Sequence, residues 1–134
     1  MALTKEKACE GALESLDMIW NAVSNAATSW AERPTMAPNV ATMNIQTVII
    51  NEVRDIGSFA AAVKEEAIKD LLGDLTTKLE AYKNSVRGGG VVNATELVRT
   101  WKKAVRGMIA DIVKAVPSAK ATDRYVHLMD RFAA

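Results

Sequence analysis

Apolar residues in the first quarter of the chain recur in steps of alternately four and three, the spacing of one face of an amphipathic helix. Thr4 can cap the start of this helix. Arg33 ends it, because a residue before proline disfavours helical dihedral angles. The pattern predicts a helix over residues 4–32 and then a proline-containing linker over 34–39. The apolar positions are Cys9, Leu13, Leu16, Trp20, Val23, Ala27 and Trp30.

A second apolar stripe begins near residue 40 and continues to a run of three glycines. One uninterrupted helix of that length would be unusual, because helices in compact domains average about 11–12 residues. Gly57 and Ser58 form a glycine-serine pair of the kind found where helices kink. We therefore expect one helix over 40–56, a break or kink near Gly57, and a further helix over 58–87.

The three glycines at 88–90 predict a hinge between two helices, because glycine commonly follows a helix end. Asn93 can cap the next helix, and Glu96 stands three residues later, which is the spacing of a capping box. The following patterns predict helices over 94–116 and 119–132. Together the elements indicate a single all-α domain over the whole chain, a helical bundle of four to five amphipathic helices.

Composition excludes several classes of protein. The chain has 134 residues, of which 49% are hydrophobic and 25% charged, as in an ordinary globular domain. Cys9 is the only cysteine, so no intramolecular disulfide can form. No apolar run reaches the roughly 18 residues that a membrane span needs, and the first residues are charged where a signal peptide is apolar. We expect a protein that is cytoplasmic, or assembled in a cytoplasm into a particle, with no membrane span.

Charge is distributed unevenly along the chain. Residues 1–80 carry 7 cationic and 12 acidic side chains, whereas residues 81–134 carry 10 cationic and 4 acidic ones. An acidic front and a basic back suggest that electrostatic contacts matter for the function.

Six cations between residues 83 and 106 form the most distinctive feature, with Glu96 the one acidic residue among them. Three interpretations stay open. The cations can neutralise the phosphates of nucleic acid, dock an acidic protein surface, or lie in water as ordinary helix charges do. The six are Lys83, Arg87, Arg99, Lys102, Lys103 and Arg106, of which the last four share one arc of about 100° on the predicted helix.

Three carboxylates, Glu66, Asp70 and Asp74, are spaced by four on the predicted second region. We interpret them as surface groups and not as metal ligands, because a hard cation prefers oxygen ligands from a loop or several elements. They are candidates to meet the basic back of another subunit. Such a head-to-tail contact produces rings or filaments. Trp30 is a further candidate for a contact between subunits, because tryptophan is enriched at binding hot spots.

Enzymatic chemistry has few candidates. The glycine run follows a helix and lacks the lysine of a phosphate-binding loop, so it predicts a connector. His127 is the only histidine, and a lone histidine can act as a general base. The sequence offers it no partnered cysteine or serine elbow. No cofactor and no small-molecule substrate are therefore expected.

The leading hypothesis is a non-enzymatic structural protein that self-assembles into an oligomer or filament and contacts nucleic acid through the basic helix face. In general organisation, the small helical subunit with its proline-broken linker and polarised charge is similar to helical-bundle coat or nucleoprotein subunits, including those of filamentous viruses. The alternative is a small helical adaptor that docks an acidic protein partner. The weakest hypothesis is a helical-bundle enzyme that uses His127.

Overall fold

The computed structural model describes residues 2–87 and 90–133, and its regular elements are all helical. The predicted all-α bundle is therefore confirmed. The elements are α1 (Lys5–Glu32), α2 (Pro38–Ala41), α3 (Met43–Ala62), α4 (Glu66–Arg87), α5 (Ala94–Ala115), the 3-10 helix η1 (Pro117–Ala121) and α6 (Asp123–Ala133).

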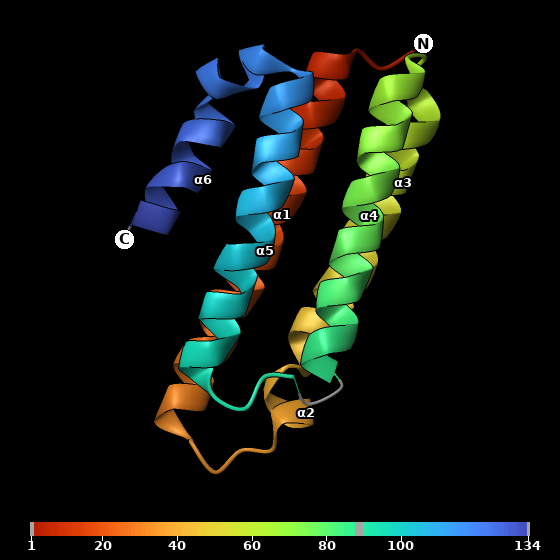
Figure 1. Cartoon of the computed structure of the whole chain (residues 1–134). Helices are drawn as coiled ribbons and strands as arrows, with labels where there is room; N and C mark the ends of the chain where they lie inside the picture. Colours follow the sequence, from red (N-terminus) through yellow and green to blue (C-terminus); the bar gives the residue numbers. More distant parts are fainter. Residues whose placement is uncertain (1, 88–89, 134) are drawn as a thin grey trace.

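Four long helices form an up-and-down bundle. Helix α1 packs against α3 and α5, and α4 packs against the same two helices on the other side of the core. Neighbouring helices in this ring run in opposite directions (Figure 1). Helix α6 lies outside the ring, where it packs against α1 and η1.

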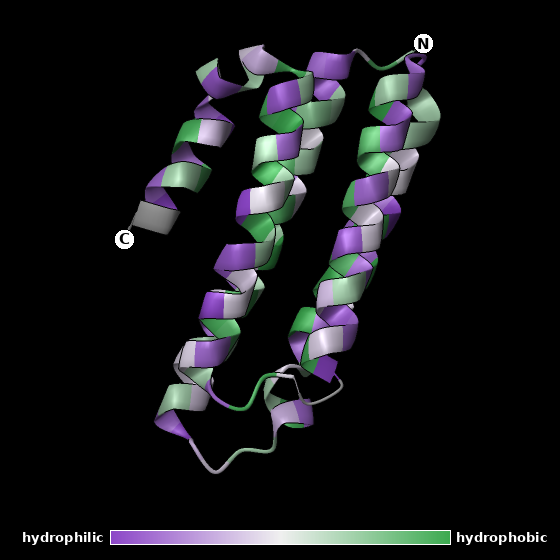
Figure 2. Cartoon of the chain, in the orientation of Figure 1, coloured by the Kyte–Doolittle hydropathy of each residue, from purple (hydrophilic) through white to green (hydrophobic). Residues whose placement is uncertain are grey.

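The core is built from the apolar stripe of each long helix. Every member of the stripe predicted for α1, from Cys9 to Trp30, is buried. Hydrophobic and hydrophilic residues alternate along the visible helices α4 and α5 (Figure 2), as expected of amphipathic helices. Each buried leucine or isoleucine contributes roughly 1.5–3 kcal/mol relative to an exposed one. Packing therefore outweighs the modest helix propensities of the individual segments.

The predicted boundary near Gly57 is wrong, because α3 continues through Gly57 and ends at Ala62. Val63 then takes an extended conformation, with φ −85° and ψ 151°, and is buried. The backbone N–H of Leu3 donates to the carbonyl of Ala62 at 2.9 Å, and Leu3 forms a parallel bridge with Val63. The end of α3 is thus fixed by the N-terminal segment and not by a glycine. A bend within α3 at Gly57 stays a prediction.

The helix predicted to begin at residue 40 is also displaced. The proline linker turns into the short helix α2, with Pro38 at its first position, where the missing N–H is not needed. Thr42 ends α2, and its hydroxyl donates to the carbonyl of Pro38 at 2.9 Å. Helix α3 therefore begins at Met43.

The single last helix predicted over 119–132 is instead two elements, η1 and α6. Thr122 separates them in an extended conformation, with φ −81° and ψ 145°. Its hydroxyl accepts a hydrogen bond from the N–H of Tyr125 at 3.2 Å, which is the role of an N-cap. Helix α6 therefore starts at Asp123.

The connection between α4 and α5 includes the predicted hinge, of which positions 88 and 89 lie outside the described residues. The N–H of Gly90 donates to the carbonyl of Ser85 at 3.0 Å. A Cβ at Gly90 would lie 2.8 Å from the same oxygen, so the close approach requires glycine. The predicted cap of α5 is confirmed, because Asn93 Oδ1 accepts from the N–H of Glu96 at 2.8 Å.

Replacing Gly57 with alanine tests the continuity of α3. A Cβ at Gly57 meets no atom within 4 Å, so Gly57→Ala should raise the free energy of unfolding by about 0.5–1 kcal/mol. Urea denaturation followed by circular dichroism measures the change.

The matched control is Gly11→Ala in α1, where the new Cβ would lie 2.7 Å from the ring of Phe59. That clash should offset the gain in helix propensity, so the control should be clearly less stable than Gly57→Ala. A loss of stability on Gly57→Ala would show that α3 is not regular at this position.

Candidate functional site

A groove of about 850 Å³ lies between the last turns of α1 and the first half of α5. Its lining contains small side chains from both helices, and its cations all come from α5. None of the lining residues is acidic. The groove is lined by Ala27, Thr28, Ala31, Ala94, Thr95, Val98, Arg99, Lys102, Lys103 and Arg106.

The position of α6 determines which part of the α1–α5 surface remains open. Helix α6 contacts α1 at Asp17 and Asn21, about one to three turns before the groove begins at Ala27. On its other side α6 borders α5 near Ile109 and Val113. The two long helices are thus covered by α6 toward one end of the bundle and open toward the other (Figure 1).

The four cations of the groove differ in how strongly the protein holds them. Arg99 is paired with Glu96, and the Lys102 ammonium lies 5.8 Å from the ring centroid of Trp20. Lys103 and Arg106 are exposed, and no carboxylate of the described residues lies within ion-pair distance of either. These two cations are therefore the most available to a ligand.

The remaining two predicted cations lie on α4 and do not line the groove. Lys83 is paired with Glu80 at 2.8 Å, and its side chain is only 16% exposed. Arg87 is exposed in the last turn of α4. The structure therefore brings together four of the six predicted cations.

The acidic row of α4 consists of Glu66, Asp70 and Asp74, and all three are exposed. They lie in the first half of α4, which runs antiparallel to α5, so they are at the opposite end of the bundle from the groove. Within the described part of the chain, no group of three or more histidine, cysteine or acidic residues is placed to hold a metal ion.

A second groove, of about 220 Å³ between α1 and α3, is lined by acidic residues that include Glu14, Glu52 and Asp55. Burial raises the pKa of Glu52, a hydrogen bond with Ser15 opposes that shift, and the charges of Asp55 and Glu14 add to it. The chain therefore carries a basic groove on one flank of α1 and an acidic groove on another.

Trp30, a predicted candidate for a contact between subunits, is held within its own chain. It is only 2% exposed, and its Nε1–H donates to the carbonyl of Met36 at 3.2 Å. The side chain joins the end of α1 to the linker within its own chain, so it presents almost no surface to a second subunit.

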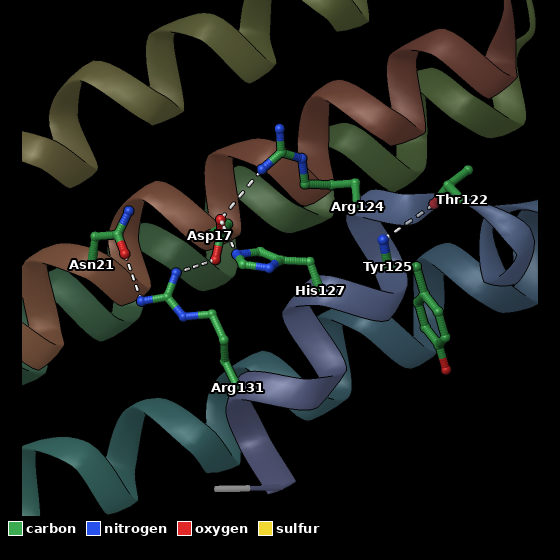
Figure 3. A network of polar contacts seen from close by, with 7 residues as sticks. All are labelled: Asp17, Asn21, Thr122, Arg124, Tyr125, His127 and Arg131. Atoms are coloured by element: carbon green, nitrogen blue, oxygen red, sulfur yellow. Dashed lines mark hydrogen bonds and ion pairs between the residues drawn. The ribbon is translucent and has the colours of Figure 1, made fainter.

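Asp17 is the centre of a polar network that sequence reasoning missed. Its side chain is only 8% exposed, and Arg131 Nη1 lies 2.6 Å from its Oδ1. Arg124 and His127 approach Oδ2 at 3.4 and 3.6 Å. Arg131 also donates to Asn21 Oδ1 at 2.5 Å. Figure 3 shows all three α6 side chains converging on this one carboxylate.

A signal for this network was present in α6. Arg124, His127 and Arg131 recur in steps of three and four, so they share one face of the helix. A row of three basic side chains on a short helix predicts an acidic partner. The sequence does not show which carboxylate that is, because Asp17 is more than 100 residues away.

The single cysteine and the single histidine of the chain both lie where they contribute to the packing of the fold. Cys9 is fully buried, and burial raises the pKa of its thiol to about 11, with Glu6 adding to the shift and Lys5 opposing it. The thiol is therefore protonated near neutral pH, and it is the thiolate that reacts. His127 faces a carboxylate already shared by Arg124 and Arg131. This contact accounts for the histidine as part of the attachment of α6, and its role as a general base stays a prediction.

Fold and site define an up-and-down four-helix bundle with an added C-terminal helix and an open basic groove. No family model matches the chain, and no curated protein or solved structure matches it either. Among the described residues, no helix combines the length and apolar character that crossing a membrane requires.

Removing the charge of Asp17 tests the attachment of α6. Asp17→Asn should lower the free energy of unfolding by about 1–3 kcal/mol, because it weakens hydrogen bonds to charged groups in a nearly buried site. Hydrogen exchange should show that protection is lost first in α6.

The control is Asp111→Asn, which breaks an ion pair with Lys78 whose side chains are 44% and 49% exposed. That change should cost less than about 1 kcal/mol. Equal effects of the two substitutions would show that the Asp17 network does not anchor α6.

Proposed function

We propose that the protein is a non-enzymatic structural subunit that binds nucleic acid in the basic groove between α1 and α5 and self-assembles into an oligomer or filament. The observation that carries the proposal is the groove itself, which has four cations and no acidic residue among its lining side chains. An ordinary solvated helix face mixes charges of both signs. A polyanion would neutralise the uncompensated charge and release counterions.

Self-assembly is supported by the separation of charge within one subunit. The exposed acidic row lies on α4, whereas the exposed Lys114 and Lys120 border the cleft between α5 and α6, outside the groove. Opposite charges on different surfaces favour a head-to-tail contact, which is heterologous and forms rings or filaments. We assign the acidic row and these two lysines to this contact, and the basic groove to nucleic acid.

The alternative proposal is an adaptor that docks an acidic protein partner in the same groove. The observation that favours it is the set of apolar lining side chains Ala27, Ala31 and Val98, which could receive the apolar face of a helix. An acidic amphipathic peptide and an oligonucleotide, titrated in parallel, separate the two proposals.

The groove proposal predicts binding of oligonucleotides that weakens as salt rises. Lys103→Glu/Arg106→Glu should raise the Kd by at least about tenfold at low salt and flatten the salt dependence, because each lost phosphate contact removes about 0.7 from the slope of log K against log salt. Fluorescence anisotropy with a labelled oligonucleotide across a salt series provides the measurement.

The matched control is Lys5→Glu/Lys64→Glu, which changes the net charge equally at two exposed positions at the other end of the bundle. It should affect binding only slightly. If both double variants weaken binding equally, net charge and not the groove is responsible. If the wild type binds the acidic peptide and no oligonucleotide, the adaptor proposal replaces ours.

The assembly proposal predicts that the protein forms large species at low salt and high concentration. Asp70→Lys/Asp74→Lys should reduce their mass, as measured by multi-angle light scattering and electron microscopy. The control Glu32→Lys/Asp130→Lys reverses two other exposed charges, both near helix C-termini, where lysine is tolerated. A wild-type protein that stays monomeric under these conditions, with and without oligonucleotide, contradicts self-assembly.

A further inference from the structure

We infer that the basic groove holds the sugar–phosphate backbone of a nucleic acid strand and leaves the bases outside. Binding would then be independent of the nucleotide sequence. This inference rests on the proposed function and specifies what the groove recognises. Proteins that bind single strands commonly combine a cationic groove with aromatic side chains on which bases stack. The groove described above has the first of these features and lacks the second among its described lining residues.

Among the described side chains, the aromatic residues near the groove are unavailable for stacking. Trp30 and Trp101 are 2% and 0% exposed. Trp20 is 8% exposed, and Lys102 and Arg131 both lie 5.8 Å from its ring centroid. A base could reach that ring only by displacing two cations. Tyr125, a half-buried aromatic residue of α6, lines the separate cleft with α5.

Side chains that read adenine and cytosine edges are also missing from the lining. Asparagine, glutamine and acidic residues make the usual contacts to these two bases, and none of them is among the lining residues. The lining cations are of the kind that can read guanine, and the same side chains neutralise phosphates. Lys103 and Arg106 are exposed, so they can meet the most exposed part of a strand, its phosphates.

The spacing of the cations fits a short stretch of backbone. Arg99, Lys103 and Arg106 lie within eight residues of α5, or about 10 Å along the helix axis. The Arg99–Glu96 pair is exposed and therefore weak, so Arg99 can exchange it for a phosphate. With one phosphate at each of these three cations, about three phosphates are neutralised. The small side chains of the lining let the strand approach closely. Thr95, exposed in the first turn of α5, adds a hydroxyl that can donate to a phosphate oxygen.

The decisive experiment compares strands that differ only in their bases. Labelled oligonucleotides of twelve units are titrated with the wild-type protein: oligo-dT, oligo-dC and a strand whose sugars carry no bases. All three should bind with Kd values that agree within about threefold. All three should also show the same salt slope of about −2, which corresponds to three neutralised phosphates.

The stacking of even one base changes affinity by about fivefold to more than a hundredfold. An abasic strand that binds more than fivefold weaker than oligo-dT therefore overturns the inference, and so does a tenfold preference between oligo-dT and oligo-dC. In either case the proposed function survives, because the groove still binds nucleic acid. If none of the three strands binds, the proposed function itself fails.

The variant Lys103→Glu/Arg106→Glu shows that the groove is the site being measured. It should weaken binding of all three strands by the same factor, whereas Lys5→Glu/Lys64→Glu should leave the three Kd values nearly unchanged. A loss confined to the strands with bases would show that the two groove cations contact bases, and this too overturns the inference.

Discussion

Helix α1 carries three kinds of contact on three of its faces, and the rest of the structure depends on them. Its apolar stripe packs against α3 and α5 and forms one side of the core. Asp17, on another face, holds α6 through Arg124 and Arg131. The last turns of α1 form the uncharged wall of the basic groove. A shift of α1 would therefore disturb the core, the attachment of α6 and the groove together.

The two basic regions of the C-terminal part behave differently because only one has an acidic counterpart. A carboxylate as buried as that of Asp17 is stable only when it is paired, and the α6 arginines provide this pairing. The positive charge of these arginines is therefore neutralised within the chain. Lys103 and Arg106 have no such counterpart among the described residues. The distinction separates cations that stabilise the fold from cations that remain free for a ligand.

Sequence reasoning succeeded where the signal is local. The ends of α1 and the start of α5 follow from Thr4, Arg33 and Asn93, each acting on residues within a few positions. The prediction failed at the end of α3, because the residue that fixes Ala62 is Leu3, which is far away in the sequence. Gly57 was a plausible break point, but an exposed glycine can remain within a helix at a cost of about 1 kcal/mol.

The difference between local signals and contacts of distant segments also explains which parts of the candidate site could be predicted. The cations of the groove were predicted, because helical periodicity places Arg99, Lys102, Lys103 and Arg106 on one arc. Their partner wall from α1 was not, because it consists of small residues that carry no chemical signal. The burial of Trp30 could not be read from the sequence, since a tryptophan that packs in a core and one that binds a partner have the same pattern. The structure buries Trp30 and joins its indole to Met36, and a role in a contact between subunits stays a prediction.

Trp20 gives the groove a physical connection to α6. Lys102 from the groove and Arg131 from α6 each lie 5.8 Å from its ring centroid. A cation–π contact contributes about 0.5–1 kcal/mol at an exposed site and more where it is shielded from water. Arg131 also anchors α6 to Asp17, so one indole ring links the groove to the attachment of α6. In the proposed function, nucleic acid that binds only the folded protein stabilises it by mass action.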